Sequence, residues 1–269
     1  MTEDGADPEP EINTAVPHSA RIWNYWLGGT DNYPVDREAG DRYRAAYPGI
    51  VDTALAARQF MARAVRFLAG EAGIRQFLDV GAGLPAADNT HQVAQRAAPD
   101  CRVVYADNDP LVLAHARDLL TSTAEGACAY VHADMREPRT ILTAAAGTLD
   151  LARPTAVLLL GALGHVSDYA EARSIVSGLL DGLPPGSYLV LADSVSSGPA
   201  HRAAGEQYAQ TGAVPYQLRS PAEIHGFFTG LEPVEPGVVP IADWRPDPSP
   251  VPPARVAALG GVARTLAPA

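Results

Sequence analysis

The 269-residue sequence contains no lysine, so all 20 of its Lys and Arg positions are arginine. Lysine-dependent chemistry is therefore excluded, including Schiff-base formation and the lysine of a phosphate-binding loop. The 31 acidic residues bring the formal net charge to −11. An acidic chain is repelled by nucleic-acid phosphates and by anionic lipids. We therefore expect no nucleic acid and no membrane among its partners.

Cysteines and long apolar runs are also scarce. Cys101 and Cys128 are the only cysteines, and their spacing is typical neither of a metal site nor of a disulfide framework. The longest apolar run, residues 156–164, is far shorter than the roughly 18 residues of a membrane span. The acidic start lacks the basic and apolar regions of a secretory signal. These absences predict a cytoplasmic protein without a metal site.

Composition and patterning divide the chain into three parts. Residues 1–16 carry five acids, two prolines and no basic residue, a composition that predicts a disordered tail. Residues 17–72 combine an aromatic-rich stretch with apolar residues at helical spacing over 51–71, which predicts a helical N-terminal cap or lid. Residues 73–269 change to short apolar runs separated by helix-like segments. We expect this third part to be the ligand-binding core.

The core pattern indicates a parallel sheet. Five apolar runs each end at a polar residue or a glycine, and successive ends lie 27 to 32 residues apart; these ends are Asp79, Asp107, Asp134, Gly161 and Asp193. A strand, a crossover helix and the next strand together take about 30 residues. Helical patterns lie between the runs, at 89–97, 110–120 and 169–180, and residues 256–266 alternate like a last strand. The predicted fold is a doubly wound, Rossmann-like α/β sheet.

The loop after the first strand suggests two possible ligands. Ligands of such sheets bind beyond the carboxyl ends of the strands, where Gly81 and Gly83 allow a tight turn and close approach of a ligand to the main chain. With Ala86 they also satisfy a relaxed dinucleotide fingerprint. However, Pro85 lacks an amide donor and Asp79 adds negative charge where a diphosphate would lie. S-adenosylmethionine has no phosphate and carries two cationic groups, so an acidic rim suits it better than NAD(P).

Acids at successive strand ends favour the same ligand. Asp107 is placed to hold the ribose hydroxyls, and Asp134 to accept from the adenine amino group. Arg58, on the predicted cap helix, is a candidate partner for the donor's carboxylate because its guanidinium matches that group. The remaining predicted donor-binding residues follow the strand ends; they are Asp79, Gly81, Gly83, Asn108, Met135 and Gly161. Each acid alone is equally consistent with a helix cap or a solvated loop carboxylate.

Several long motifs resemble one family. They are residues 19–33 (SARIWNYWLGGTDNY), 77–85 (FLDVGAGLP), 89–95 (NTHQVAQ) and 103–117 (VVYADNDPLVLAHAR). Together they resemble the actinobacterial S-adenosylmethionine-dependent methyltransferases long catalogued as a domain of unknown function, over about residue 17 to the C-terminus. The resemblance implies a class I methyltransferase fold, a seven-stranded sheet with an antiparallel last strand, S-adenosylmethionine as donor and S-adenosylhomocysteine as product. It implies no particular acceptor.

Two residues are candidates for catalysis. His165 follows the fourth predicted strand and could act as a base, because histidine titrates near neutrality; a structural role is the alternative. The family often has two histidines at this point, where this chain has Gly164 and His165. Tyr33, in the aromatic segment before the cap helix, could contact the acceptor as part of a lid or could anchor that segment.

The sequence therefore predicts a methyltransferase that acts on a small-molecule acceptor by in-line transfer. Two other hypotheses remain: a non-catalytic sensor or regulator that binds S-adenosylmethionine, and an NAD(P)-dependent oxidoreductase. The sequence contains no signal for the identity of the acceptor or for the oligomeric state.

Overall fold

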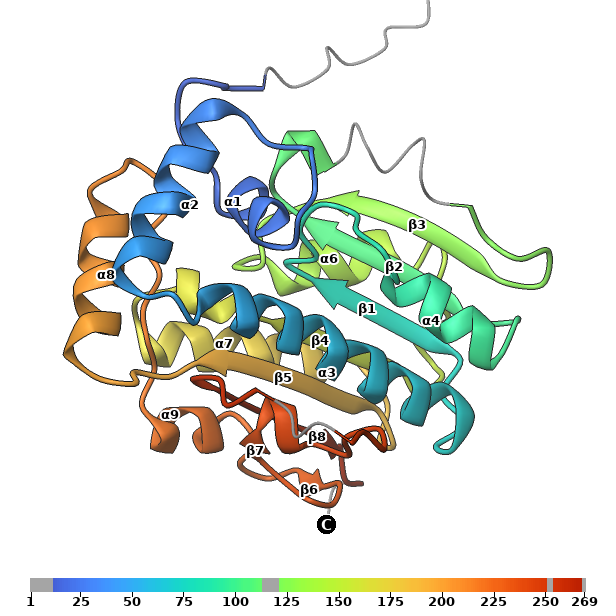
Figure 1. The fold of residues 1–269 in the computed structure, drawn as a ribbon. Helices are drawn as coiled ribbons and strands as arrows, with labels where there is room; N and C mark the ends of the chain where they lie inside the picture. The colour runs from blue at the N-terminus through green and yellow to red at the C-terminus, as the bar shows by residue number, and fades with distance from the viewer. Residues whose placement is uncertain (1–11, 113–120, 251–253, 268–269) are drawn as a thin grey trace, which may run out of the picture.

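A twisted β-sheet forms the centre of the computed structural model, which describes residues 12–112, 121–250 and 254–267 (Figure 1). The strand order is β3-β2-β1-β4-β5-β8-β6, and β7 pairs with β8. The described strands are β1 (Gln76–Val80), β2 (Arg102–Asp107), β3 (Ala127–His132), β4 (Ala156–Leu160), β5 (Tyr188–Ser194), β6 (Glu232–Pro233), β7 (Val239–Pro240) and β8 (Ala258–Arg264). Strands β1 to β5 are parallel and β8 is antiparallel to β5. The predicted doubly wound sheet with an antiparallel last strand is confirmed.

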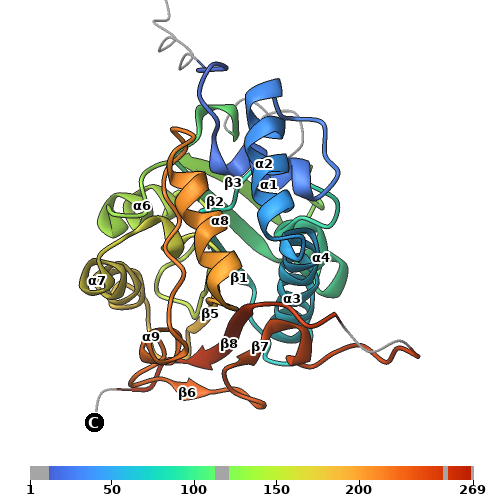
Figure 2. The ribbon, with the colours of Figure 1, turned by 60° about the vertical axis from the view of Figure 1, so that its left-hand side comes forward.

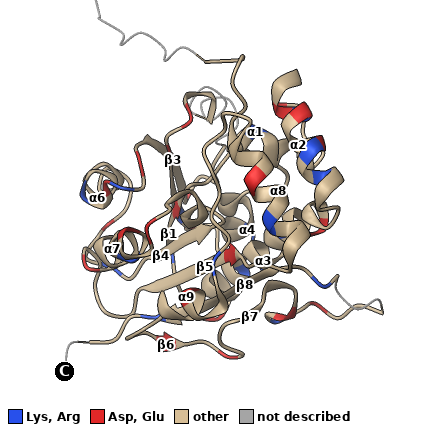
Figure 3. Ribbon diagram, turned by 90° about the vertical axis from the view of Figure 1, so that its left-hand side faces the viewer, with Lys and Arg blue, Asp and Glu red and all other residues tan. Residues whose placement is uncertain are grey.

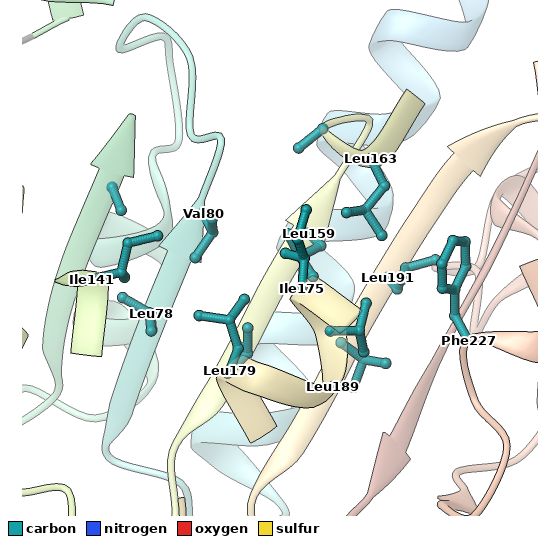
Figure 4. Packing of buried hydrophobic residues seen from close by; sticks show 14 of the residues in the cluster. Leu78, Val80, Ile141, Leu159, Leu163, Ile175, Leu179, Leu189, Leu191 and Phe227 are labelled. Carbon is teal, nitrogen blue, oxygen red and sulfur yellow. The ribbon is translucent and has the colours of Figure 1, made fainter. Parts of the chain in front are cut away.

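Helices cover both faces of this sheet. On one face lie α3 (Ile50–Gly70) and α4 (Thr90–Ala97), with Phe60 and Leu68 packed against Phe77 and Leu158. On the other face lie α6 (Pro138–Ala145), α7 (Tyr169–Leu180) and α9 (Pro221–Gly226). Figure 4 shows the second layer, where Ile175 and other leucine and isoleucine side chains of α6 and α7 meet the strands. The alternating apolar positions of each strand therefore face two separate helical layers.

Three helices gather at the carboxyl end of the sheet. They are α1 (Ser19–Trp26), α2 (Pro34–Ala46) and α8 (Pro199–Ala209), and Figure 2 shows α8 beside α2. Ile22, Tyr43 and Tyr208 join them in a small apolar cluster that is separate from the two cores of the sheet. The predicted helical segment 17–72 thus contains three helices, of which α1 and α2 lie over the strand ends while α3 packs on the sheet.

The structure differs from the prediction in its C-terminal third and in one connector. The short strands β6 and β7 make the sheet eight-stranded among the described residues, where the resemblance implied seven. Each has only two residues and contains a proline, so neither shows an alternating pattern. The two short helical turns η1 (Leu163–His165) and η2 (Ile241–Asp243) were also not predicted. Most of the predicted helix 110–120 and of the predicted tail 1–16 lies outside the described residues.

Candidate active site

A cavity of about 230 Å³ lies between the carboxyl ends of the strands and helices α1, α2, α3 and α8. Nine of the residues predicted from the sequence line it; they are Arg58, Asp79, Gly81, Gly83, Asp107, Asn108, Met135, Gly161 and His165. Two predicted residues, Tyr33 and Asp134, do not line it. Among the described residues, no group of three acidic, histidine or cysteine side chains is arranged to hold a metal ion.

The glycine loop after β1 brings main chain close to this cavity. Gly81 has φ +71°, and a Cβ there would lie 2.5 Å from the Cβ of Ala162. Gly83 has φ +67°, and a Cβ at that position would meet nothing within 4 Å. Both conformations favour glycine. The turn therefore combines a close contact with the β4 loop at Gly81 and open space at Gly83.

The carboxylate of Asp107 is built into this loop. Its Oδ2 accepts from the Gly83 amide at 2.8 Å, and its Oδ1 accepts from the Asp109 amide at 3.0 Å. Burial raises the pKa of Asp107, while these two amide donors oppose the rise. Because each carboxylate oxygen has two lone pairs, each can accept one further hydrogen bond. Asp107 can thus receive two neighbouring hydroxyl groups from the cavity.

Asp79 and Arg58 form a second polar region of the wall. Thr90 Oγ1 donates to Asp79 Oδ2 at 2.6 Å, and burial raises the pKa of Asp79 to about 6. A cation bound beside a buried carboxylate favours its ionised form. Arg58 donates from Nη2 to the carbonyls of Ala87 and Asp88, both at 2.9 Å. These bonds hold the guanidinium at the cavity and leave its other N–H groups for a ligand.

The helix that follows the glycine loop is poorly placed for a diphosphate. In a dinucleotide site the glycine turn leads directly into a helix whose first amides bind the pyrophosphate. Here α4 begins only at Thr90. Two amides that precede the helix are also already used, because Ala86 N–H donates to Asn89 Oδ1 and Asn89 N–H donates to Gln92 Oε1. The geometry therefore disfavours NAD(P) and agrees with the charge argument from the sequence.

Asp134 and Tyr33, the two predicted site residues that do not line the cavity, contact other parts of the protein. Asp134 Oδ1 accepts from the Arg136 amide at 2.9 Å, and the Arg136 guanidinium lies 3.4 Å from the same oxygen. Met135, next to Asp134, does line the cavity, so Asp134 stands at its rim. Tyr33 precedes α2 and packs beside Leu84 and Leu111, with the Arg21 guanidinium 5.3 Å from its ring centroid.

His165 lies on the turn after β4 and lines the cavity. Its Nδ1 is 3.2 Å from the Pro215 carbonyl oxygen. A carbonyl only accepts, so Nδ1 carries the proton and Nε2 of the neutral ring keeps its lone pair. Burial lowers the pKa of His165, so the ring is neutral at pH 7. Tyr216 packs edge-on against it, with ring centroids 5.1 Å apart.

Two buried acids, Asp36 and Asp109, fasten the start of helix α1 to α2 and to the loop after β2. The His18 amide donates to Asp36 Oδ1 at 2.9 Å, and the Tyr33 amide donates to Asp36 Oδ2 at 2.8 Å. His18 Nδ1 lies 2.9 Å from Asp109 Oδ2. Burial opposes ionisation of Asp109, but the hydrogen bond and charge of His18 hold its pKa below the ordinary value. The start of α1 is thereby joined to the loop that carries Asp107.

Several cavity residues were not predicted. They are mostly aromatic or apolar and come from the cap helices, α8 and the loop after it; they include Tyr43, Ile50, Met61, Tyr208, Val214 and Tyr216. Pro199, a typical residue for the first turn of a helix, was an available sequence signal for α8. Tyr216 lies in a loop without periodicity, so no local pattern marks it.

Comparisons with known proteins agree with this geometry. Residues 5–266 match the sequence family described as S-adenosyl methyltransferase. A DUF574 family protein from Streptomyces avermitilis is 44% identical, with a TM-score of 0.90 over 95% of this chain and 100% of the other. A candidate methyltransferase from Thermobifida fusca is 39% identical, with a TM-score of 0.88 over 97% and 100% of the two chains. None of the curated protein sequences matches the chain.

A more distant comparison concerns the fold alone. The magnesium protoporphyrin IX methyltransferase from Synechocystis, solved with bound S-adenosylmethionine, is 14% identical and has a TM-score of 0.51 over 91% of this chain and 89% of the other. The class I methyltransferase architecture predicted from the sequence is confirmed. Among the described residues, no helix combines the length and apolarity that a membrane crossing requires.

Proposed function

The chain belongs to the S-adenosyl methyltransferase family, and we propose that it methylates a small organic molecule held in the cavity beside the donor. The observation that carries this proposal is the position of the cavity. It lies at the carboxyl ends of the strands beneath α1, α2 and α8, with His165 in its wall. Such a covered space of about 230 Å³ suits a small molecule better than a macromolecular surface.

The residues around the glycine loop suit S-adenosylmethionine chemically. Asp107 would hold the ribose hydroxyls, and Asp134 at the rim would accept from the adenine amino group. Asp79 would face the ammonium group, and Arg58 the carboxylate of the methionine part. Main chain at Gly81, Gly83, Asn108, Met135 and Gly161 would contact the rest of the donor. The carboxylates of Asp107 and Asp79 can each accept further hydrogen bonds, and the space at Gly83 is open; these features support the fit.

Alignment and proton removal are the tasks left to the protein itself. When bound, S-adenosylmethionine supplies a methyl group that its sulfonium has already activated. The walls of the cavity hold the acceptor in line with that group and keep it from diffusing away. His165 Nε2 takes the proton that an acceptor hydroxyl or amine loses, because its Nδ1 is already engaged with the Pro215 carbonyl.

Helices α1 and α2 would act as the lid of this site. Their attachment to the donor loop through His18 and Asp109, and to each other through Asp36, supports that role. A closed lid excludes water and completes the acceptor wall. We further propose a cytoplasmic location, since both cysteines are free thiols, which are typical of reducing compartments.

The size of the acceptor is tested by following a labelled methyl group. The protein is incubated with methyl-labelled S-adenosylmethionine and a cell extract, which is then separated by ultrafiltration into small molecules and macromolecules. We expect protein-dependent label in the small-molecule fraction, and none with heat-inactivated protein. Label confined to the macromolecules would contradict the proposal. An extract that accepts no label from a protein shown to bind the donor would favour the non-catalytic sensor instead.

A further inference from the structure

The cavity has two chemically different halves, one at the ends of β1 and β2 and the other at the ends of β4 and β5. The sheet order places β1, β2 and β3 on one side of the site and β4 and β5 on the other. Asp79 lies near the end of β1, which the glycine loop follows, and Asp107 ends β2. On the other side, His165 follows β4 and Ser194 ends β5. If the donor lies over β1 and β2 as proposed, the acceptor lies over β4 and β5. The following argument rests on that proposed function.

Aromatic rings dominate the acceptor half. All five Trp and Tyr residues that line the cavity come from α1, α2, α8 or the loop after α8; they are Trp23, Trp26, Tyr43, Tyr208 and Tyr216. Four of them form a continuous chain of ring contacts, with centroid distances of 5.8 Å from Trp23 to Trp26, 5.3 Å from Trp26 to Tyr43 and 5.9 Å from Tyr43 to Tyr208. Because each ring fixes the next, the wall is rigid and presents ring faces and edges to the acceptor.

The fifth ring closes the floor of this half. Tyr216 packs directly on the turn after β4, where a Cβ at Gly164 would lie 2.3 Å from the tyrosine ring. Its hydroxyl donates to the buried carboxylate of Asp193, and that carboxylate also accepts from the Ser194 amide. The hydroxyl end of the ring is thus held in place, and glycine at position 164 allows it to lie so close to the backbone.

The charged groups that line the cavity beside His165 are already paired. The Arg136 guanidinium is bound to Asp134, Glu171 and the His165 carbonyl, and His18 is bound to Asp109. Burial raises the pKa of Tyr43, of Tyr208 and of Tyr216, so all three phenols are un-ionised at neutral pH. Asp193 lies behind Tyr216 and does not line the cavity. Figure 3 shows that the charged residues of α2 lie along the helix, and its Glu38 and Arg42 are paired with each other and exposed. A charged acceptor would lose its hydration here without gaining an unpaired counterion.

Polar atoms of three further groups at this wall are available to an acceptor. The hydroxyls of Tyr43 and Tyr208 make no hydrogen bond with any described residue, although both residues line the cavity. The third atom is Nε2 of His165, which keeps its lone pair. Two phenol hydroxyls and one imidazole nitrogen on an aromatic wall match a flat molecule that bears one or two neutral polar groups.

We propose that the acceptor is an uncharged, planar aromatic compound that carries a hydroxyl or amino group. Its ring packs against the aromatic wall, and its polar group lies within reach of His165. Aromatic pairs contribute about 0.5–1.5 kcal/mol beyond the area that they bury. Several such contacts distinguish an aromatic acceptor from a saturated one of the same size, and the lack of an unpaired counterion disfavours its charged analogues.

Four probes of similar shape test this proposal by calorimetric titration of the protein already saturated with S-adenosylhomocysteine. They are β-naphthol, which is neutral and flat; β-naphthoate, an anion; β-naphthylmethylamine, a cation; and decalol, which is neutral and saturated. We expect β-naphthol to bind about tenfold more tightly than each of the others. Equal or tighter binding of naphthoate, naphthylmethylamine or decalol would overturn the proposal, as would no binding of β-naphthol.

Variants then locate the bound ring. Trp23→Ala should weaken β-naphthol binding about tenfold, whereas Tyr25→Ala on the same helix, whose ring does not line the cavity, should change it little. Tyr43→Phe and Tyr208→Phe keep the wall but remove its free hydroxyls, and at least one should weaken β-naphthol binding severalfold. Unchanged binding in Trp23→Ala and in both phenylalanine variants would contradict this wall as the site.

Failure of this inference can be told apart from failure of the proposed function. The affinity for S-adenosylhomocysteine is measured in the same experiment and should be unchanged in these variants, which also shows that they are folded. A protein that binds S-adenosylhomocysteine but no naphthol keeps the donor site and loses only the aromatic acceptor. A protein that does not bind S-adenosylhomocysteine loses both.

Discussion

Replacing Asp107 by asparagine should lower the affinity for S-adenosylhomocysteine by about 100-fold, or about 2.7 kcal/mol. Hydrogen bonds to a charged partner contribute about 1.5–3 kcal/mol each, and two ribose hydroxyls would lose such a partner. The amide also disturbs the loop, because two backbone N–H groups, of Gly83 and Asp109, point at this carboxylate. An asparagine offers only one acceptor oxygen, so its NH₂ group would face one of these donors.

Asp100→Asn is the matched control for this variant. Asp100 lies two residues before the start of β2, at the opposite end from Asp107, and forms an ion pair near the surface with Arg75. Such pairs contribute little to stability, and Asp100 does not line the cavity. Calorimetry of the three proteins gives the affinities, and thermal unfolding without ligand shows whether each variant is folded. A folded Asp107→Asn protein that binds as tightly as the wild type would contradict the proposed ribose contact.

The second large effect is expected at His165. Replacement by glutamine should lower kcat by about 10²–10⁴-fold, the usual contribution of general-base catalysis, with little change in the affinity for S-adenosylhomocysteine. Glutamine can still donate a hydrogen bond toward the Pro215 carbonyl, but it cannot take up a proton. The variant therefore separates proton removal from positioning. His225→Gln is the control, because His225 is exposed on α9 and does not line the cavity.

The pH dependence of kcat gives an independent test of the same role. Burial lowers the pKa of His165 below its ordinary value of 6.5, and the base is active only when the ring is neutral. The rate should therefore rise with pH through a value below 6.5 and then stay level through neutral pH. His165→Gln should remove this rise along with most of the rate. A variant with the wild-type profile would show that another group is the base.

The core of the fold could be predicted because its pattern is local and repeated. Asp79, Asp107 and Gly161 end, or immediately follow, short apolar runs at the spacing of a βαβ unit, and in the structure they meet at one edge of the sheet. Parallel topology brings these ends together, so spacing along the chain was sufficient to place them. The same reasoning placed His165, which follows the next strand.

The acceptor half could not be predicted by that reasoning. Tyr43, Tyr208 and Tyr216 come from separate segments and meet only through the packing of α2 against α8. No spacing along the chain signals such a contact. Gly164 illustrates the point: the sequence shows only that one histidine of the family pattern is absent, whereas the structure shows the Tyr216 ring in the space that a side chain would fill.

Tyr33 and Asp134 show the limits of predicting contacts from position in a loop. Tyr33 belongs to the aromatic segment, yet its ring packs beside Leu84 and Leu111 while Trp23 and Trp26 of the same segment line the cavity. Trp23 and Trp26 lie on α1, whereas Tyr33 follows the loop after that helix and caps α2, so the two parts of the segment have different surroundings. Asp134 ends up at the rim because its carboxylate caps the turn at Arg136.

The most direct test of the central claim is calorimetric titration of the wild-type protein with S-adenosylhomocysteine and, separately, with NADH. The carboxylates of Asp79 and Asp107, and the late start of α4 at Thr90, predict one-site binding of S-adenosylhomocysteine in the micromolar range, about −8 kcal/mol. They also predict no saturable binding of NADH. Saturable binding of NADH by a protein that does not bind S-adenosylhomocysteine would contradict the account.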